Sequence, residues 1–273
     1  SLGETDTEDT LLEEAVALAR NSERVLLFAG TPAEDECEGF DRPHLRLPDV
    51  QTRLIERILA ENANTAVVLS AAGPLEMPWI ERARAVLFCY LPGQAGGAAI
   101  ADVVLGDVSP SGKLAETFPL RLEDVPSHPY FGQERIVEYR ESVFVGYRYY
   151  NSANKEVLFP FGHGLSYTEF SYENLRVSHE NGGVKAIFTL RNAGKRAGAE
   201  AAQVYVCPPE GGVFRPAQAL ANFEKVLLQP GEERIVSITL EARAFSVYDP
   251  ALKSWRVPGG RYGICVGASS RDI

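Results

Sequence analysis

Four acidic side chains lie within five consecutive positions of one short segment, at Glu34, Asp35, Glu36 and Glu38. Like charges this close repel one another, and in a partly closed cleft repulsion and desolvation would raise the pKa of at least one carboxyl. A carboxyl with a raised pKa can act as a general acid near neutral pH. The segment therefore predicts acid catalysis, against the alternative that it is only a solvated surface loop.

The acidic segment directly follows an apolar run. Residues 25–29 are continuously apolar, which is typical of a buried strand, and Gly30-Thr31-Pro32 ends the run abruptly. Open α/β sheets place their chemistry at the carboxyl ends of their strands. The sequence therefore predicts that the acids are displayed at the functional edge of a sheet.

The residues after Glu38 complete the segment as Gly39, Phe40, Asp41 and Arg42. Glycine at this place would let the backbone approach a ligand closely. For Asp41 and Arg42 we expect mainly an ion pair or a cap that shapes the loop. Contact with a substrate is the second interpretation of this Asp-Arg pair.

Helix-like and strand-like segments alternate through the first hundred residues. A capping box at Thr10-Leu11-Leu12-Glu13 predicts that the first helix begins there. We expect further helices at 50–60 and 98–105, a short helical piece near 79–83, and strands at 66–71 and 85–90. Apolar strands in such an alternation indicate a parallel sheet covered on both faces. Three strands make an incomplete sheet, so either the domain is small or further strands precede it.

The second half of the chain has a different pattern. Residues 107–167 are rich in turn formers and aromatics, and an irregular stretch of this length is usually functional or interfacial. From residue 170 onward, apolar and polar residues alternate between turns, which predicts an antiparallel β-sandwich. We therefore expect an α/β plus all-β protein. Its α/β domain would span residues 1–168, with an irregular linker from about 107, and its sandwich residues 169–273.

The net charge of −10 lies mostly in the first 38 residues, which hold eleven acidic and two basic residues. An acidic chain without basic stripes is a poor ligand for nucleic acid or anionic membranes, so a neutral substrate fits better. No long apolar run predicts a membrane span, and the N-terminus lacks a secretory pattern. We expect a cytoplasmic protein, although secretion stays open if the chain is a fragment.

The cysteines and histidines indicate no metal or cofactor. The cysteines are widely spaced, at Cys37, Cys89, Cys207 and Cys265, and show no paired metal-ligand spacing. Free thiols are expected, although Cys207 and Cys265 lie in apparent strands of one domain and could be neighbours. Acidic neighbours make Cys37 a weak nucleophile. For His163, between two glycines, a structural hydrogen bond is favoured over catalysis.

Three long motifs then point to a family. They are PGQAGGAAIADVVLGDVSPSGKLAETFP at residues 92–119, YRESVFVGYRYY at 139–150 and FPFGHGLSYTEF at 159–170. They resemble the C-terminal half of glycoside hydrolase family three, the β-glucosidase and β-xylosidase group. Residues 36–51 and 73–79 resemble that family's sheet domain. The segments NAGKRAGAEAAQVYV, LANFEKVLLQPGEE and VPGGRYGICVGASSRDI resemble its fibronectin type III-like domain.

The resemblance implies a retaining glycosidase acting on a β-linked glucoside or short oligosaccharide. An aspartate nucleophile would lie on a β/α barrel, and a glutamate acid/base would come from the sheet domain. The family's glutamate before Gly-aromatic-Asp-Arg corresponds to Glu38, with Glu36 as the runner-up. No barrel pattern occurs in these residues, so the nucleophile is expected on another segment or chain. The barrel domain is then the expected partner, and a homo-oligomer is a further option.

Two other functions stay open at this point. One is a non-catalytic carbohydrate-binding or scaffold module, which the sandwich strands do not favour because Trp255 is the single tryptophan there. The other is β-xylosidase or α-arabinofuranosidase specificity, which nothing in these residues separates from β-glucosidase specificity. Ser142 departs from the family pattern, since relatives usually have glycine after Tyr-x-Glu.

Overall fold

The computed structural model describes residues 4–132, 135–180 and 182–273. The chain packs into two compact units. The first runs to Ala101 and includes Leu120–Leu122. The second comprises Asp102–Pro119 and Glu123–Ile273, so it holds the sandwich together with most of the irregular stretch.

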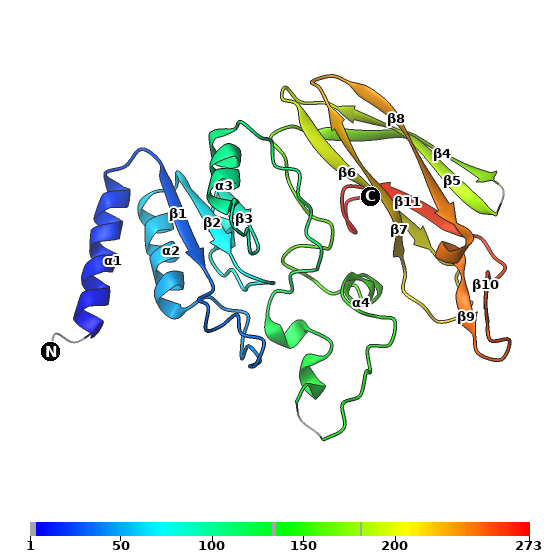
Figure 1. Ribbon diagram of the computed structural model, residues 1–273, viewed down its shortest axis with the longest axis horizontal. Helices are drawn as coiled ribbons and strands as arrows, with labels where there is room; N and C mark the ends of the chain where they lie inside the picture. The colour runs from blue at the N-terminus through cyan, green and yellow to red at the C-terminus, as the bar shows by residue number, and fades with distance from the viewer. Residues whose placement is uncertain (1–3, 133–134, 181) are drawn as a thin grey trace. The chain divides into compact units, whose positions relative to one another are not determined.

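The first unit contains a parallel sheet. Its helices and strands are α1 (Glu4–Arg20), β1 (Val25–Gly30), α2 (Asp49–Glu61), β2 (Thr65–Ser70), a 3₁₀ turn (Ile80–Arg82), β3 (Ala85–Phe88) and the first part of α3 (Gly96–Leu105) (Figure 1). The strand order is β1-β2-β3, and both pairs are parallel, with Val25 opposite Thr65 and Ala66 opposite Ala85. The parallel sheet predicted from the sequence is therefore confirmed.

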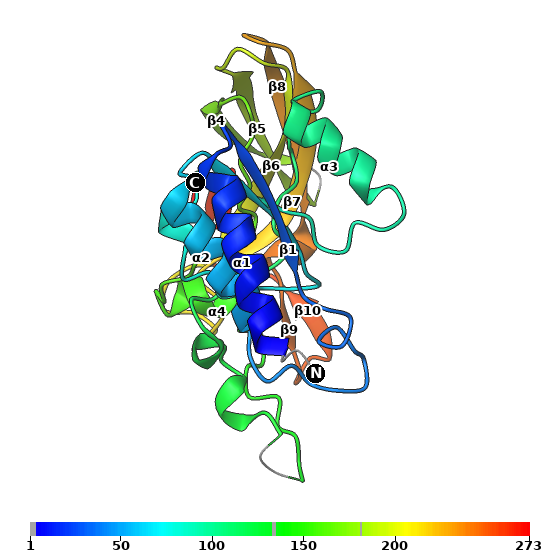
Figure 2. The same cartoon turned by 90° about the vertical axis from the view of Figure 1, so that its left-hand side faces the viewer.

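Helices α1 and α2 lie side by side in both views (Figures 1 and 2). Val16 of α1 and Ile55 of α2 are completely buried, as apolar residues at helical spacing require. At the surface, Arg53 pairs with Asp9 and Arg57 with Glu13. These two ion pairs link the middle of α1 to α2.

The predicted start of the first helix was wrong. Helix α1 begins at Glu4, so Thr10 lies inside it and is not its N-cap. A Thr-x-x-Glu pattern places the two side chains one turn apart on a helix surface, which is equally compatible with a helix interior. In the structure the chain is helical on both sides of Thr10, so the pattern lies in a helix interior.

The expectation that helices cover both faces of the sheet fails at β1. Leu27 is buried on one face, whereas Leu26 and Phe28 on the other face are exposed. Alternate residues of a strand point to opposite faces, so one covering layer of helices buries only every second side chain. Strand β2, which lies between two neighbours, has Val67, Val68 and Leu69 all buried.

The second unit begins with the irregular stretch. It contains 3₁₀ turns, of which His128–Tyr130 is one, the short helix α4 (Tyr147–Ser152), and an isolated bridge between Phe118 and Phe159. Tyr147 stacks on Phe161 at 4.6 Å between ring centroids and meets the edge of Tyr205 at 6.0 Å. Aromatic packing therefore holds this stretch onto the outer face of the sandwich.

Ser142, the departure from the family pattern, has φ +52°. This left-handed conformation costs a non-glycine residue roughly 1 kcal/mol, which glycine would not incur. We expect Ser142→Gly to raise the free energy of unfolding by roughly 0.5–1 kcal/mol, measured from the shift of the urea midpoint. Ser127 has φ −81°, so Ser127→Gly is the matched control and should destabilise. Equal effects of the two substitutions would contradict the strain at residue 142.

The sandwich consists of two three-stranded sheets and a hairpin, all antiparallel (Figure 1). Its strands are β4 (Phe170–Glu180), β5 (Gly183–Asn192), β6 (Gly198–Cys207), β7 (Ala219–Leu228), β8 (Glu233–Glu241), β9 (Val247–Asp249), β10 (Ser254–Arg256) and β11 (Gly263–Gly267). The sheet orders are β4-β5-β8 and β11-β6-β7, with the hairpin β10-β9. Alternate side chains of both sheets, such as Phe188, Val204 and Ile238, form one buried core. The predicted antiparallel sandwich is confirmed.

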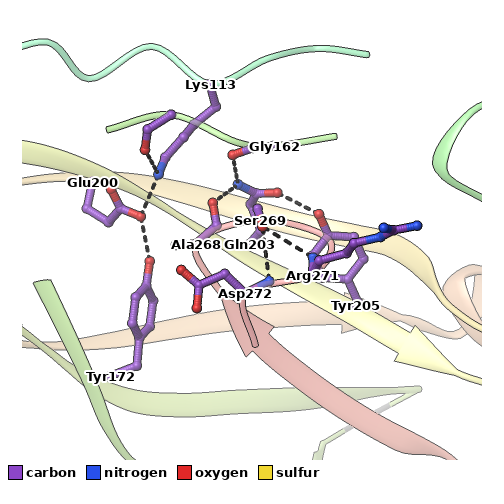
Figure 3. A network of polar contacts seen from close by, with 11 residues as sticks. Lys113, Gly162, Tyr172, Glu200, Gln203, Tyr205, Ala268, Ser269, Arg271 and Asp272 are labelled. Atoms are coloured by element: carbon purple, nitrogen blue, oxygen red, sulfur yellow. Dashed lines mark hydrogen bonds and ion pairs between the residues drawn. The ribbon is translucent and has the colours of Figure 1, made fainter. Parts of the chain in front are cut away.

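A buried polar network joins the irregular stretch to the sandwich (Figure 3). The carboxylate of Glu200 accepts hydrogen bonds from Lys113 Nζ at 2.9 Å and from the Tyr172 hydroxyl at 2.7 Å. The Lys113 ammonium also donates to the Gly164 carbonyl at 3.1 Å. Burial and the neighbouring Glu200 carboxylate raise the pKa of Tyr172 well above its usual value, so its hydroxyl stays a donor. The sequence predicts a turn-rich stretch around Lys113 and does not indicate this ion pair.

His163 lies beside this network, and its ring stacks on Phe159 at 5.0 Å. Burial lowers the pKa of His163, and the charge of Lys113 adds to this, although Asp272 opposes it. The folded chain therefore resists protonation of His163, whereas the unfolded chain accepts a proton near pH 6.5. Stability contributed in this way is present at higher pH and is lost as pH falls below about 6.5 toward the lowered pKa.

We therefore expect the urea concentration at the unfolding midpoint to decrease as the pH is lowered from 7.5 to 5.5. The decrease should be smaller in His163→Gln. One proton limits the effect to a tenfold change in the unfolding equilibrium per pH unit. The matched control is His179→Gln, because His179 is exposed on β4. If both variants keep the wild-type pH dependence, His163 is not responsible for it.

Candidate functional site

The acidic loop leaves the sheet at the carboxyl end of β1, as the sequence predicts. The Gly30 amide donates to the Gln51 side chain at 2.9 Å, and the Thr31 amide donates to the Ser70 carbonyl at 3.0 Å. A Cβ at residue 30 would collide with that carbonyl oxygen, so only glycine fits. These contacts hold the base of the loop close to the ends of β1 and β2.

Glu36 is fixed inside the loop. Its carboxylate accepts hydrogen bonds from the Thr31 hydroxyl and from the Ala72 amide, the latter at 3.1 Å. Burial tends to raise the pKa of Glu36, but these hydrogen bonds and the charge of Arg42 outweigh it and lower the pKa below its ordinary value. Glu36 is therefore not a carboxyl whose pKa the crowding raises. An ionised, hydrogen-bonded carboxylate suits a positioning role better than a general acid.

Glu38 has a different environment only two residues away. Its side chain is exposed, and it has no hydrogen bond or ion pair with any residue that the structure describes. Gly39 follows it, and Phe40, the next residue, is 81% exposed. Glu38 is therefore a carboxylate free to meet a ligand, with an exposed aromatic ring two residues away.

Asp41 and Arg42 form no ion pair with each other in the described part of the chain. Arg42 instead acts on Glu36, whose pKa its charge helps to lower. The Nη2 atom of Arg42 is buried without a hydrogen-bond partner among the described residues. Arg42 therefore influences the loop through its charge, which favours the ionised form of Glu36. Contact of Asp41 or Arg42 with a substrate stays a prediction.

The sequence therefore predicts the acidic loop, but not that Glu36 is hydrogen-bonded within it while Glu38 is exposed. The signal available was Thr31, a hydroxyl directly after the strand, which could have marked one of the nearby acids as anchored. In the described ranges, no group of three or more His, Cys, Asp and Glu side chains could hold a metal ion. Among the same residues, no helix is long and apolar enough to span a membrane.

Two family models match the chain. Residues 4–167 match the glycosyl hydrolase family 3 C-terminal domain, and residues 200–270 match a fibronectin type III-like domain. The first match alone covers more than half of the chain. The segment that carries Glu36 and Glu38 lies within it.

Curated relatives agree with these matches. The chain is 48% identical over 271 residues to thermostable beta-glucosidase B of Acetivibrio thermocellus, covering 97% of this chain and 36% of the relative. It is 44% identical to an exo-alpha-(1->6)-L-arabinopyranosidase of Bifidobacterium breve, with the same two coverages. The chain therefore spans about a third of the length of the curated relatives that it matches.

Solved structures show the same fold. The Bifidobacterium adolescentis GH3 beta-glucosidase matches with a TM-score of 0.94 at 43% identity, over 97% of this chain and 40% of that one. Beta-glucosidase from Kluyveromyces marxianus in complex with glucose matches with a TM-score of 0.93 at 39% identity, over 97% and 32%. An α/β domain followed by a fibronectin type III-like sandwich is thus the shared architecture.

Proposed function

The chain belongs to glycosyl hydrolase family 3, and from this membership we propose that it is the C-terminal part of a retaining β-glucosidase and supplies its general acid/base, Glu38. The nucleophile, an aspartate on a β/α barrel, lies outside these residues in this proposal. The observation that carries it is the environment of Glu38, an exposed side chain at the carboxyl end of a parallel sheet, without a hydrogen bond or ion pair to the described residues. Glu36, the runner-up, is already engaged by Thr31 and Ala72.

The proposed reaction has two steps. In the first, Glu38 protonates the glycosidic oxygen while the aspartate attacks the anomeric carbon, so that the aglycone leaves and a glycosyl-enzyme ester forms. In the second, the Glu38 carboxylate takes a proton from water, and that water attacks the anomeric carbon and releases the sugar. Retention requires the two carboxyl groups to be about 5–5.5 Å apart. The acidic loop must therefore reach the partner that carries the aspartate.

An exposed apolar segment in the second unit supports the need for such a partner. Tyr139 is 91% exposed, and Ile136 and Val137 beside it are also exposed. Apolar side chains gathered on a surface in this way usually mark an interaction site. We propose that residues 136–139 contact the remainder of the same enzyme, which is the partner that the mechanism requires.

The test is to assay the chain alone and joined to the rest of its enzyme with an aryl β-D-glucoside. We expect turnover only from the joined form, because one carboxyl group cannot both protonate and attack. Turnover by the isolated chain at the rate of the joined form would overturn the proposal that the nucleophile lies outside these residues. Sugar binding by the isolated chain that survives Glu38→Gln would favour the carbohydrate-binding alternative.

The names of some relatives support a second substrate specificity, for α-L-arabinopyranosides. Relatives at 44% identity carry the name exo-alpha-(1->6)-L-arabinopyranosidase, at the same coverage as the beta-glucosidase of Acetivibrio thermocellus. The acid/base chemistry is the same for both sugars. An aryl α-L-arabinopyranoside belongs in the same assay, and a higher kcat/KM for it than for the glucoside would replace the β-glucosidase proposal.

A further inference from the structure

Two thiols in the sandwich lie close together outside the candidate site. Cys207 is the last residue of β6 and Cys265 lies in β11, and their sulfur atoms are 3.3 Å apart. Both cysteines are free and half-buried. They are 58 positions apart in the sequence, so the fold alone brings them together.

The register of the two strands explains the contact. In the antiparallel pair, Cys207 lies opposite Gly263 and Cys265 lies opposite Tyr205, so the cysteines are diagonal neighbours on one face. A Cβ at residue 263 would lie 3.2 Å from the Cys207 Cβ, tighter than an ordinary contact. Because Gly263 has no side chain, the thiol of Cys207 has room to lean toward Cys265.

From this juxtaposition we propose that Cys207 and Cys265 are a redox modification site, at which a low-molecular-weight disulfide such as oxidised glutathione converts the two thiols into an intramolecular disulfide. The other two cysteines do not share this geometry. Cys37 is exposed in the acidic loop of the first unit, and the Cys89 thiol donates to the Leu87 carbonyl at 3.7 Å.

The reaction balances in two exchange steps. One protein thiolate attacks oxidised glutathione, forms a mixed disulfide and releases one glutathione thiolate. The second protein thiolate attacks the protein sulfur of that mixed disulfide, forms the Cys207–Cys265 bond and releases the second glutathione thiolate. The two protons lost by the protein thiols end on the two glutathione thiolates. Two electrons pass from the protein to oxidised glutathione, which is the oxidant.

The bond requires the two sulfur atoms and the backbone beside them to move closer together. A disulfide bond is about 2.05 Å long, so the sulfurs must approach by about 1.3 Å. Cys207 ends its strand and is followed by Pro208 and Pro209, which cannot extend the β ladder, so the backbone can adjust there. Burial and the neighbouring Cys265 raise the pKa of the Cys207 thiol well above its usual value, so thiolate is scarce and the exchange is slow at neutral pH.

The disulfide would close a loop that contains β7, β8 and the hairpin β10-β9. A cross-link over a long loop constrains the unfolded chain more than the folded one. We therefore expect the oxidised chain to unfold at a temperature several degrees higher than the reduced chain, and dithiothreitol to reverse the shift.

The test is to incubate the chain with excess oxidised glutathione for hours and to count thiols and map peptides without reduction. The test also uses a Cys37→Ser/Cys89→Ser variant, here called the matched form, in which Cys207 and Cys265 are the remaining cysteines. We expect it to lose both thiols, to yield one linked peptide containing Cys207 and Cys265, and to do so at a rate independent of protein concentration. Cys207→Ser and Cys265→Ser in that background should each stop at the mixed disulfide with glutathione.

Retention of both thiols in the matched form would overturn the proposal, as would two glutathionylated cysteines without a cross-link. A rate that rises with protein concentration would also overturn it, because the bond would then join two chains. Peptide mapping of the wild-type chain gives the same decision if a variant fails to fold. None of these readouts depends on glycosidase activity, so they stay separate from the proposed function.

Discussion

Replacing Glu38 with alanine in the full-length enzyme is expected to lower kcat/KM for β-glucosides by 10²- to 10⁴-fold, the usual contribution of a positioned general acid. The loss should be smallest for aryl glucosides with acidic leaving groups, because those leave without protonation. Slow breakdown of the glycosyl-enzyme should then limit turnover, because no base remains to activate water.

Azide identifies the acid/base directly. The anion can enter the space that the Glu38 carboxyl vacates and attack the glycosyl-enzyme without base assistance, giving a β-glycosyl azide. We expect added azide to accelerate Glu38→Ala several-fold or more and to leave the wild type unchanged. The absence of both rescue and the azide product would remove Glu38 from the acid/base role.

Two neighbouring acids give the controls. Glu34 is exposed in the same loop and has no hydrogen bond or ion pair with the described residues, so Glu34→Ala should retain nearly wild-type activity. Glu36→Ala removes the hydrogen bonds to Thr31 and Ala72 and should lower activity by loosening the loop. Because the Glu38 acid/base would still be present, azide should not rescue Glu36→Ala. Rescue of Glu36→Ala by azide would instead assign the acid/base role to Glu36.

The second large effect is expected at Lys113. Its side chain is 12% exposed and that of Glu200 only 5%, so Lys113→Met would leave the carboxylate of Glu200 buried with the Tyr172 hydroxyl as its remaining donor. Removing one partner of a buried ion pair costs about 3–5 kcal/mol. For a unit of this size we expect the melting temperature to fall by roughly 10 °C, measured by calorimetry.

A double variant separates the buried charge from the lost side-chain packing. Lys113→Met combined with Glu200→Gln removes both charges and keeps an acceptor for Tyr172, so most of the lost stability should return. Lys195 is exposed in a turn, and Lys195→Met should change the melting temperature very little. If the double variant is less stable than Lys113→Met, the packing of these side chains matters more than their charges.

Much of the fold could be predicted because its signals are local. The continuous apolar run of β2 and the alternating residues of β5 and β8 reflect which faces of each strand are buried, and that periodicity is visible in the chain itself. The start of α1 could not be predicted, because a Thr-x-x-Glu pattern fits a helix interior as well as a helix start.

The sequence by itself determined the two architectures, the place of the acidic loop after β1, and the motifs that assign the family. Only the tertiary structure decided which acid is anchored and which is free, because the Ala72 amide that holds Glu36 lies 36 positions away along the chain. It also decided that Lys113 meets Glu200 and that Cys207 meets Cys265. Hydrogen bonds, buried ion pairs and thiol contacts act over a few ångströms, and residues distant in sequence come within that range only when the chain folds.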